Sequence, residues 1–171
     1  MKYNQFFVVV SLALCLFAVT LSGCSVSETD PATAGNAEKG KAFLEENKNK
    51  EGVISFPNGM QYMVLKSGSG HQAKMTDTVT VHYRGMHIDG NEFDNSYERG
   101  EPLTISLKSM IPGWKKALLL MHEGDTWRLF IPPFLAYTNR GSGSIEPNET
   151  LIYEIELLSV NWMGRRKDLI N

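Results

Sequence analysis

The chain has very little cysteine: of its 171 residues only Cys15 and Cys24 carry a thiol, and both lie near the N-terminus. A disulfide framework, or a zinc site built on cysteines, is therefore excluded for the rest of the sequence. The folded part has to be stabilised by its hydrophobic core alone, and a domain of about 100 residues is long enough to bury one.

The chain also lacks a large excess of charge of either sign. The sequence has 17 basic and 19 acidic residues, for a formal net charge of −2, so we expect no nucleic acid as a partner. Its histidines are scattered, and no nucleophile with a base, phosphate loop or internal repeat is recognisable. We therefore expect neither a metal site nor a cofactor; the four histidines are His71, His82, His87 and His122.

Only the N-terminus has a long apolar run, in which Phe6 to Leu21 form 16 uncharged residues. A run this short, followed by small residues, is typical of a secretion signal rather than a membrane-spanning helix. The sequence L-S-G-C that ends at Cys24 also resembles the bacterial lipobox, where cleavage before the cysteine lets its thiol take up lipid. This predicts a signal peptide over 1–23 and a lipid anchor on Cys24; the alternative is an uncleaved anchor helix with an incidental cysteine.

The residue after the cysteine bears on the destination of such a lipoprotein. Ser25 stands where an aspartate would resemble the inner-membrane retention signal. We therefore expect a lipid-anchored protein of the bacterial cell envelope, in the outer membrane and facing the periplasm. Its contact with the membrane would be made through the Cys24 lipid, and stable anchoring needs more than one acyl chain.

Between the anchor and the folded domain the composition changes twice. Residues 24–35 are rich in small and polar residues and predict a flexible tether. Asn36 is a suitable N-cap for a helix from Ala37 to about Lys50, which gives a spacer helix over 36–51. Its apolar stripe is too narrow for a coiled-coil seam, so we expect the helix to dock through Phe43 and the protein to be a monomer.

Residues 52–160 have the pattern of an α+β domain, and a basic tail follows over 161–171. Val79, Val81 and Tyr83 alternate with polar residues, as on a half-buried strand. Pro112 begins a predicted helix with one buried stripe at i, i+3, i+4 and i+7, formed by Trp114, Ala117, Leu118 and Met121. We expect one short helix across an antiparallel sheet of about five strands, over 60–66, 79–86, 103–107, 126–131 and 150–159.

Five motifs in this region resemble the FKBP-type peptidyl-prolyl cis–trans isomerase family, in the family's order and at close to its spacing. They are V-H-Y-R-G (81–85), D-G-N-E-F-D-N-S (89–96), M-I-P-G-W (110–114), L-A-Y (135–137) and L-I-Y-E-I-E-L-L (151–158). The segment over 37–53 is similar to the one that precedes this domain in the macrophage-infectivity-potentiator branch. The resemblance implies a twisted antiparallel half-barrel wrapped around one short α-helix.

The same resemblance implies the site and its roles. Tyr83, Phe93, Asp94 and Tyr137 would be catalytic: Phe93 and Tyr137 would flank the rotating bond, and Asp94 would lie near its carbonyl. Arg99 falls where the family often has a basic partner for the Asp–Tyr pair. The implied substrate-binding residues are Leu103, Ile105, Met110, Ile111, Trp114, Ile145 and Tyr153, with Trp114 as the floor of the pocket and the backbone N–H of Ile111 holding a substrate carbonyl.

The implied function is prolyl isomerisation that assists the folding of exported proteins, with proline-containing polypeptides as partners and the macrolides tacrolimus and rapamycin as ligands to test. Two departures bear on its rate: Leu103 stands where many members have Phe, and Thr138 where the family usually has Gly. The alternative is a non-catalytic peptide-binding or chaperone module of the same fold. A third hypothesis, a surface adhesin or virulence factor, is suggested by the branch resemblance alone.

Overall fold

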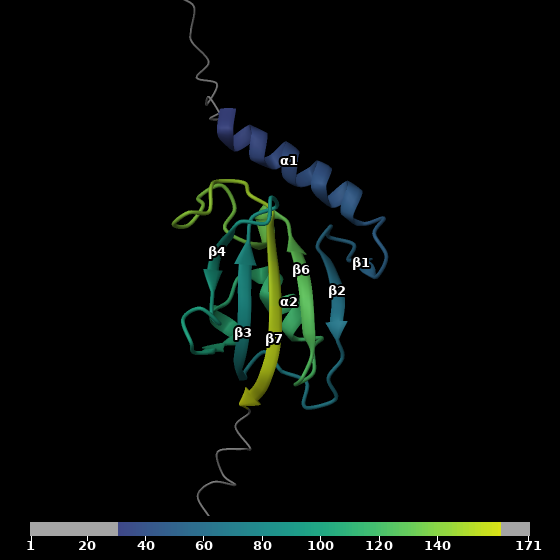
Figure 1. The fold of residues 1–171 in the computed structure, drawn as a ribbon, viewed down its shortest axis with the longest axis vertical. Helices are drawn as coiled ribbons and strands as arrows, with labels where there is room; N and C mark the ends of the chain where they lie inside the picture. Colours follow the sequence, from purple (N-terminus) through teal and green to yellow (C-terminus); the bar gives the residue numbers. More distant parts are fainter. Residues whose placement is uncertain (1–30, 162–171) are drawn as a thin grey trace, which may run out of the picture.

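The computed structural model describes residues 31–161, in which a seven-stranded antiparallel sheet has the order β1-β2-β6-β7-β3-β4 and β5 pairs with β3 as well (Figure 1). The predicted signal peptide, Cys24 and the tail from residue 162 lie outside these residues. The strands are β1 Val53–Ser55, β2 Gln61–Lys66, β3 Thr78–Met86, β4 Glu92–Asn95, β5 Leu103–Ser106, β6 Thr126–Ile131 and β7 Leu151–Asn161.

The prediction of about five strands was too low, since β1 and β4 were not expected as strands. Each has only three or four residues, which is too short for a clear alternation of apolar and polar side chains. The expected alternation is confirmed on β3, where Val79, Val81 and Tyr83 are buried, and on β7, whose buried residues include Leu151, Tyr153, Ile155 and Leu157.

The short helix α2, Pro112–Leu118, lies behind β6 and β7 in Figure 1 and fills the concave side of the sheet. All four residues of the predicted stripe are buried, although Met121 lies three residues beyond the end of the helix. Gly113 permits the close approach, because a Cβ there would lie 2.6 Å from Cγ2 of Ile131 on β6. Two 3₁₀ turns, η1 Leu107–Ser109 and η2 Pro133–Leu135, border this face.

Helix α1, Pro31–Asn47, corrects the expected N-terminal boundary. The prediction that Asn36 caps a helix beginning at Ala37 was wrong, because the helix includes residues 31–35, which the sequence had assigned to the tether. Asn36 lies inside the helix, and its side-chain amide donates to Glu146 Oε2 at 2.8 Å and to the carbonyl of Pro147 at 3.3 Å. Asn36, which local preferences favoured as a helix cap, therefore makes a tertiary contact instead.

Helix α1 is docked against the domain, and Figure 1 shows it crossing one end of the sheet. The predicted contact of Phe43 is present: its ring lies 6.0 Å from that of Phe130 on β6. Near the C-terminal end of the helix, the buried amide of Asn47 donates to Gln61, which in turn donates to the carbonyl of Leu44. Within residues 31–161, neither helix is both long and apolar enough to cross a membrane.

Replacement of Gly40 on α1 tests this docking. A Cβ at Gly40 would lie 2.9 Å from Cβ of Thr150, which is buried, so Gly40→Ala should lower the free energy of unfolding by about 1–3 kcal/mol. The matched control is Gly35→Ala on the same helix, where a Cβ meets nothing within 4 Å. The control should gain about 0.5–1 kcal/mol from the better helix former. Urea unfolding of both variants measures the difference; equal stabilities would contradict the packing of α1 on Thr150.

Candidate active site

A pocket of about 260 Å³ opens between the sheet and α2. Aromatic side chains from β3, α2 and β7 form its inner part, and η1 with the segment before α2 forms one wall. It is lined by Tyr83, Asp94, Leu103, Ile105, Ser109, Met110, Ile111, Trp114, Tyr137 and Tyr153. The structure thus brings together predicted residues from six separate segments of the chain.

Two predicted residues, Phe93 and Ile145, do not line this pocket. Phe93 packs edge to face on Tyr153, with ring centroids 5.6 Å apart and an interplanar angle of 84°. Ile145 is buried in the core cluster. Ser109 lines the pocket but was not predicted from the sequence; its place directly before Met110, at the end of η1, is the only signal that could have found it.

The floor of the pocket is built from the indole of Trp114 and two tyrosine rings that each meet it at nearly a right angle. Trp114 meets Tyr83 at 5.0 Å and 78°, and Tyr153 at 5.1 Å and 87°, which are the edge-to-face geometries that aromatic pairs prefer. All three are buried, with exposed fractions of 4%, 7% and 3% respectively. The indole N–H of Trp114 is buried and has no hydrogen-bond partner among the described residues, so the floor combines three aromatic rings with one unpaired donor.

The rim carries one polar network, formed by Tyr83, Asp94 and Arg99. The hydroxyl of Tyr83 donates to Oδ2 of Asp94 at 2.5 Å and accepts from Nη2 of Arg99 at 3.0 Å, and Nη1 of Arg99 forms an ion pair with Oδ1 of Asp94. The guanidinium also lies over the ring of Tyr83, 5.3 Å from its centroid. Arg99 therefore has the position expected for a basic partner of the Asp–Tyr pair.

Burial raises the pKa values of Tyr83 and Tyr153. For Tyr83 burial is the larger cause, and the hydrogen bond to Asp94 raises its pKa further. For Tyr153 burial again comes first, followed by interactions with Tyr137. Both phenols therefore stay protonated at neutral pH, so they can donate hydrogen bonds and carry no charge into the apolar floor.

One backbone donor points to a place for a polar substrate group. Ile111 is the N-cap residue of α2, and within residues 31–161 its N–H has no hydrogen-bond partner. Because Ile111 precedes the first helical residue, Pro112, its N–H takes part in no hydrogen bond within α2. A carbonyl that entered the pocket over Trp114 would satisfy it. Among the described residues, no group of three or more His, Cys, Asp or Glu side chains is placed to hold a metal ion.

An apolar cup with one neutralised carboxylate and one free N–H can bind a small apolar ring beside a carbonyl. Such a site offers desolvation and shape rather than a nucleophile or a proton relay. The family comparison identifies the fold in which it sits: a model described as FKBP-type peptidyl-prolyl cis-trans isomerase matches residues 69–158. The chain belongs to the FKBP-type peptidyl-prolyl cis-trans isomerase family. A second model, for the domain amino-terminal to such isomerases, matches residues 25–64.

Individual relatives agree with this assignment. The chain is 51% identical over 126 residues to the peptidyl-prolyl cis-trans isomerase Mip of Coxiella burnetii, and 48% identical over 126 residues to the outer membrane protein MIP of Legionella longbeachae. Each alignment covers 73% of this chain but only 55% and 54% of the relatives, so the chain spans about half of their length.

A solved structure of a peptidyl-prolyl cis-trans isomerase from Pseudomonas syringae pv. tomato is similar with a TM-score of 0.71 and 36% identity. That match covers 78% of this chain and 99% of the other.

Thr138 is the departure from the FKBP pattern that the structure explains. Its φ is +58°, the left-handed conformation that the family's usual glycine adopts freely and a β-branched residue adopts poorly. Two hydrogen bonds hold it there: its N–H donates to the carbonyl of Pro133 at 2.9 Å, and its carbonyl accepts from Asn148 at 2.8 Å. The loop beside Tyr137 therefore contains local strain.

Thr138→Gly should relieve this strain. The left-handed conformation costs an L-residue about 1–2 kcal/mol, and glycine gives back about 0.5–1 kcal/mol in chain entropy, so we expect a gain of roughly 0.5–1 kcal/mol in the free energy of unfolding. Thr76→Gly is the control, because Thr76 is exposed and its φ is negative; it should lose stability. Urea titration decides, and a loss of stability in Thr138→Gly would show that Thr138 is not strained.

Proposed function

We propose that this chain is a peptidyl-prolyl cis–trans isomerase that acts on exported polypeptides, with the pocket over Trp114 as its active site. The observation that carries the proposal is the combination of an apolar aromatic floor with the Tyr83–Asp94–Arg99 rim, in a chain of the FKBP-type family. Its substrates would be polypeptides that present a proline in an accessible segment.

The chemistry follows from the amide bond. Rotation about a peptide bond has a barrier of about 18–20 kcal/mol, because resonance is lost in the twisted state. X–Pro bonds populate both isomers and exchange over tens to hundreds of seconds. Water stabilises the planar, charge-separated amide more than the twisted one, so transfer to an apolar pocket lowers the barrier. A reduction of about 5–6 kcal/mol corresponds to a roughly ten-thousandfold faster reaction.

Each part of the pocket has a role in this proposal. The proline ring lies on Trp114 between Tyr83 and Tyr153, and Leu103, Ile105 and Met110 exclude water from one side. A carbonyl of the substrate accepts from the N–H of Ile111. Asp94, held in place by Arg99 and Tyr83, accepts hydrogen bonds near the rotating bond, and Tyr137 closes the opposite side. Phe93 packs on Tyr153 and supports that ring.

The cellular setting is also part of the proposal. A protein lipidated at Cys24 and anchored in the outer membrane would meet proteins that fold after export. The name of the Legionella longbeachae relative, an outer membrane protein, supports an envelope location. In sequence only residues 25–30 separate the proposed anchor from α1, which is docked on the domain, so the length of this segment would limit the distance between the domain and the membrane.

The decisive test is a protease-free prolyl isomerisation assay on the chain without its predicted signal peptide, with and without rapamycin. Asp94→Asn and Tyr83→Phe should each lower kcat/KM roughly tenfold by removing rim hydrogen bonds that hold the site in place. Phe is preferred to Ala at position 83, because truncation of a buried ring would leave a cavity and lower the free energy of unfolding by several kcal/mol.

The matched control for these variants is Glu51→Gln, an exposed carboxylate away from the pocket. Rapid turnover that rapamycin blocks, with the control unchanged, supports the isomerase. A folded protein with no turnover would refute it and favour a peptide-binding module of the same fold. Turnover that both rim variants retain in full would leave the activity but overturn the assignment of the rim.

A further inference from the structure

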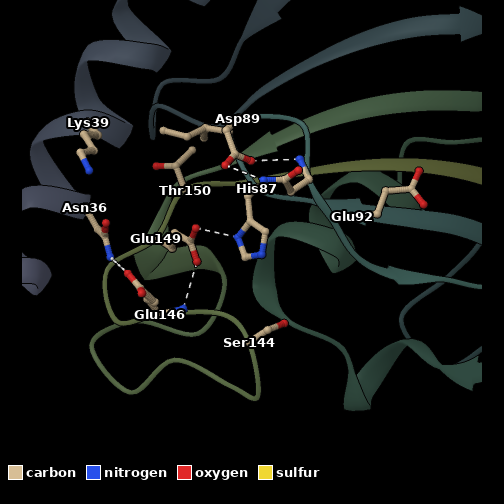
Figure 2. Close-up of a pocket in the computed structure, with 11 residues that line it drawn as sticks. Asn36, Lys39, His87, Asp89, Glu92, Ser144, Glu146, Glu149 and Thr150 are labelled. Carbon is tan, nitrogen blue, oxygen red and sulfur yellow. Dashed lines mark hydrogen bonds and ion pairs between the residues drawn. The ribbon is translucent and has the colours of Figure 1, made fainter.

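A second, larger cavity of about 560 Å³ lies between α1, the β3–β4 turn and the loop before β7 (Figure 2). Figure 2 shows the imidazole of His87 near its centre, with the carboxylate of Glu149 directed at it. Neither residue belongs to the pocket over Trp114. The cavity is lined by Asn36, Lys39, His87, Ile88, Asp89, Asn91, Glu92, Ser144, Glu146, Glu149 and Thr150.

Glu149 uses both of its carboxylate oxygens. Oε1 lies 2.7 Å from Nδ1 of His87, and Oε2 accepts from the backbone N–H of Glu146 at 3.0 Å. Both side chains of the His–Glu pair are mostly buried, with exposed fractions of 19% and 15%. Because an ionised carboxylate only accepts hydrogen bonds, Nδ1 of His87 carries a proton, and the direction of the imidazole ring is fixed.

The ring of His87 packs against Phe93. The two centroids are 5.0 Å apart at an interplanar angle of 65°. Phe93 is held on its other sides by Tyr153, in an edge-to-face contact, and by Gly85, where a Cβ would lie 2.7 Å from Cζ of Phe93. Of these three neighbours, His87 is the one that is itself attached to a different loop, through Glu149.

That loop is tied down as well. Asn36 on α1 donates to the side chain of Glu146 and to the carbonyl of Pro147, as Figure 2 shows for the first of these bonds. The loop also contains Ile145, which is buried in the core. A continuous set of contacts therefore runs from α1 through Glu146, Glu149 and His87 to the Phe93 ring, and from there to Tyr153 in the floor of the pocket.

We propose that His87 and Glu149 are positioning residues for the active site: the pair fixes the Phe93 ring against Tyr153. This rests on the proposed isomerase function and deepens it. Imidazole suits the task because it supplies a flat ring for Phe93 and an N–H for Glu149 at once. Phenylalanine would keep only the ring contact, and glutamine only the hydrogen bond.

The pair is not required by the sheet. His87 follows the last residue of β3, and Glu149 lies two residues before β7, so neither contributes to the strand ladders. Its removal should therefore shift Phe93 with little effect on the fold. The loss of kcat/KM should be largest for substrates with a large residue before the proline. That residue lies nearest to the rotating bond and to the wall that Phe93 supports.

His87→Phe and His87→Gln test the two contacts separately in the full chain, with His122→Gln as the matched control. His122 is a half-exposed histidine beyond α2 and touches neither the pocket nor Phe93. We expect each His87 variant to lower kcat/KM by roughly three- to tenfold for Ala-Leu-Pro-Phe, and by less for Ala-Ala-Pro-Phe. The midpoint of thermal unfolding should move by less than about 4 °C, and the control should change neither the rate nor the ratio between peptides.

A double-mutant cycle with Phe93→Leu shows whether His87 acts through Phe93. In that background His87→Gln should change kcat/KM by less than about twofold, because the group that it positions is gone. An equal loss in both backgrounds, or no loss in either, would overturn the inference. Glu149→Gln should keep most of the activity, since an amide can still bond to both partners with the other imidazole tautomer, whereas Glu149→Leu should behave like His87→Phe.

Failure of this inference is distinguishable from failure of the proposed function. If the unmodified chain has no turnover, the proposed function is refuted, and calorimetric affinity for Ala-Leu-Pro-Phe becomes the readout for the same variants. Weaker binding by His87→Phe and His87→Gln, with His122→Gln unchanged, then supports positioning. Unchanged affinity overturns it, and so does an unmodified chain that neither turns over nor binds the peptide.

Discussion

Trp114 is held between Tyr83 and Tyr153, which come from neighbouring strands of the sheet, and the pocket depends on this packing of α2 across β3 and β7. The two strands pair directly, with Gly85 opposite Tyr153, so their tyrosines reach the same face. Gly113 allows the helix to approach closely enough for the indole to meet both rings edge to face. The same contact thus closes the core and forms the floor of the site, which makes core stability and substrate binding inseparable at these three residues.

Much of this could be predicted from the sequence, because the relevant signals are periodic. Alternation along β3 and β7 and the stripe of α2 predicted which side chains are buried, and the five motifs contain seven of the ten residues that line the pocket. Where elements are short or contacts are long-range, the sequence had no such signal. Strands β1 and β4 have too few residues to alternate, and Asn36 is attractive as a helix cap but is used for a bond to Glu146, 110 residues away.

The same limit applies to the second layer around the site. Phe93 was predicted to flank the rotating bond because its motif position implies it, and in the structure its ring packs against both Tyr153 and His87. His87 and Glu149 are separated by 62 residues, and no motif in the sequence connects this histidine with this glutamate. Only the pairing of β3 with β7, which brings the ends of both strands together, gives these two residues a common role.

The site has an apolar floor and a polar rim, and the two departures at Leu103 and Thr138 lie outside both. The floor is apolar and rigid, and its tyrosines are kept neutral by burial. The rim concentrates charge in one pair, Asp94 with Arg99, where each charge offsets the other at the edge of solvent. A thinner wall at Leu103 changes the shape of the pocket but neither of these conditions, and strain at Thr138 falls on a loop outside the three-ring packing. Such changes should alter which peptides fit before they affect whether an amide can be desolvated and turned.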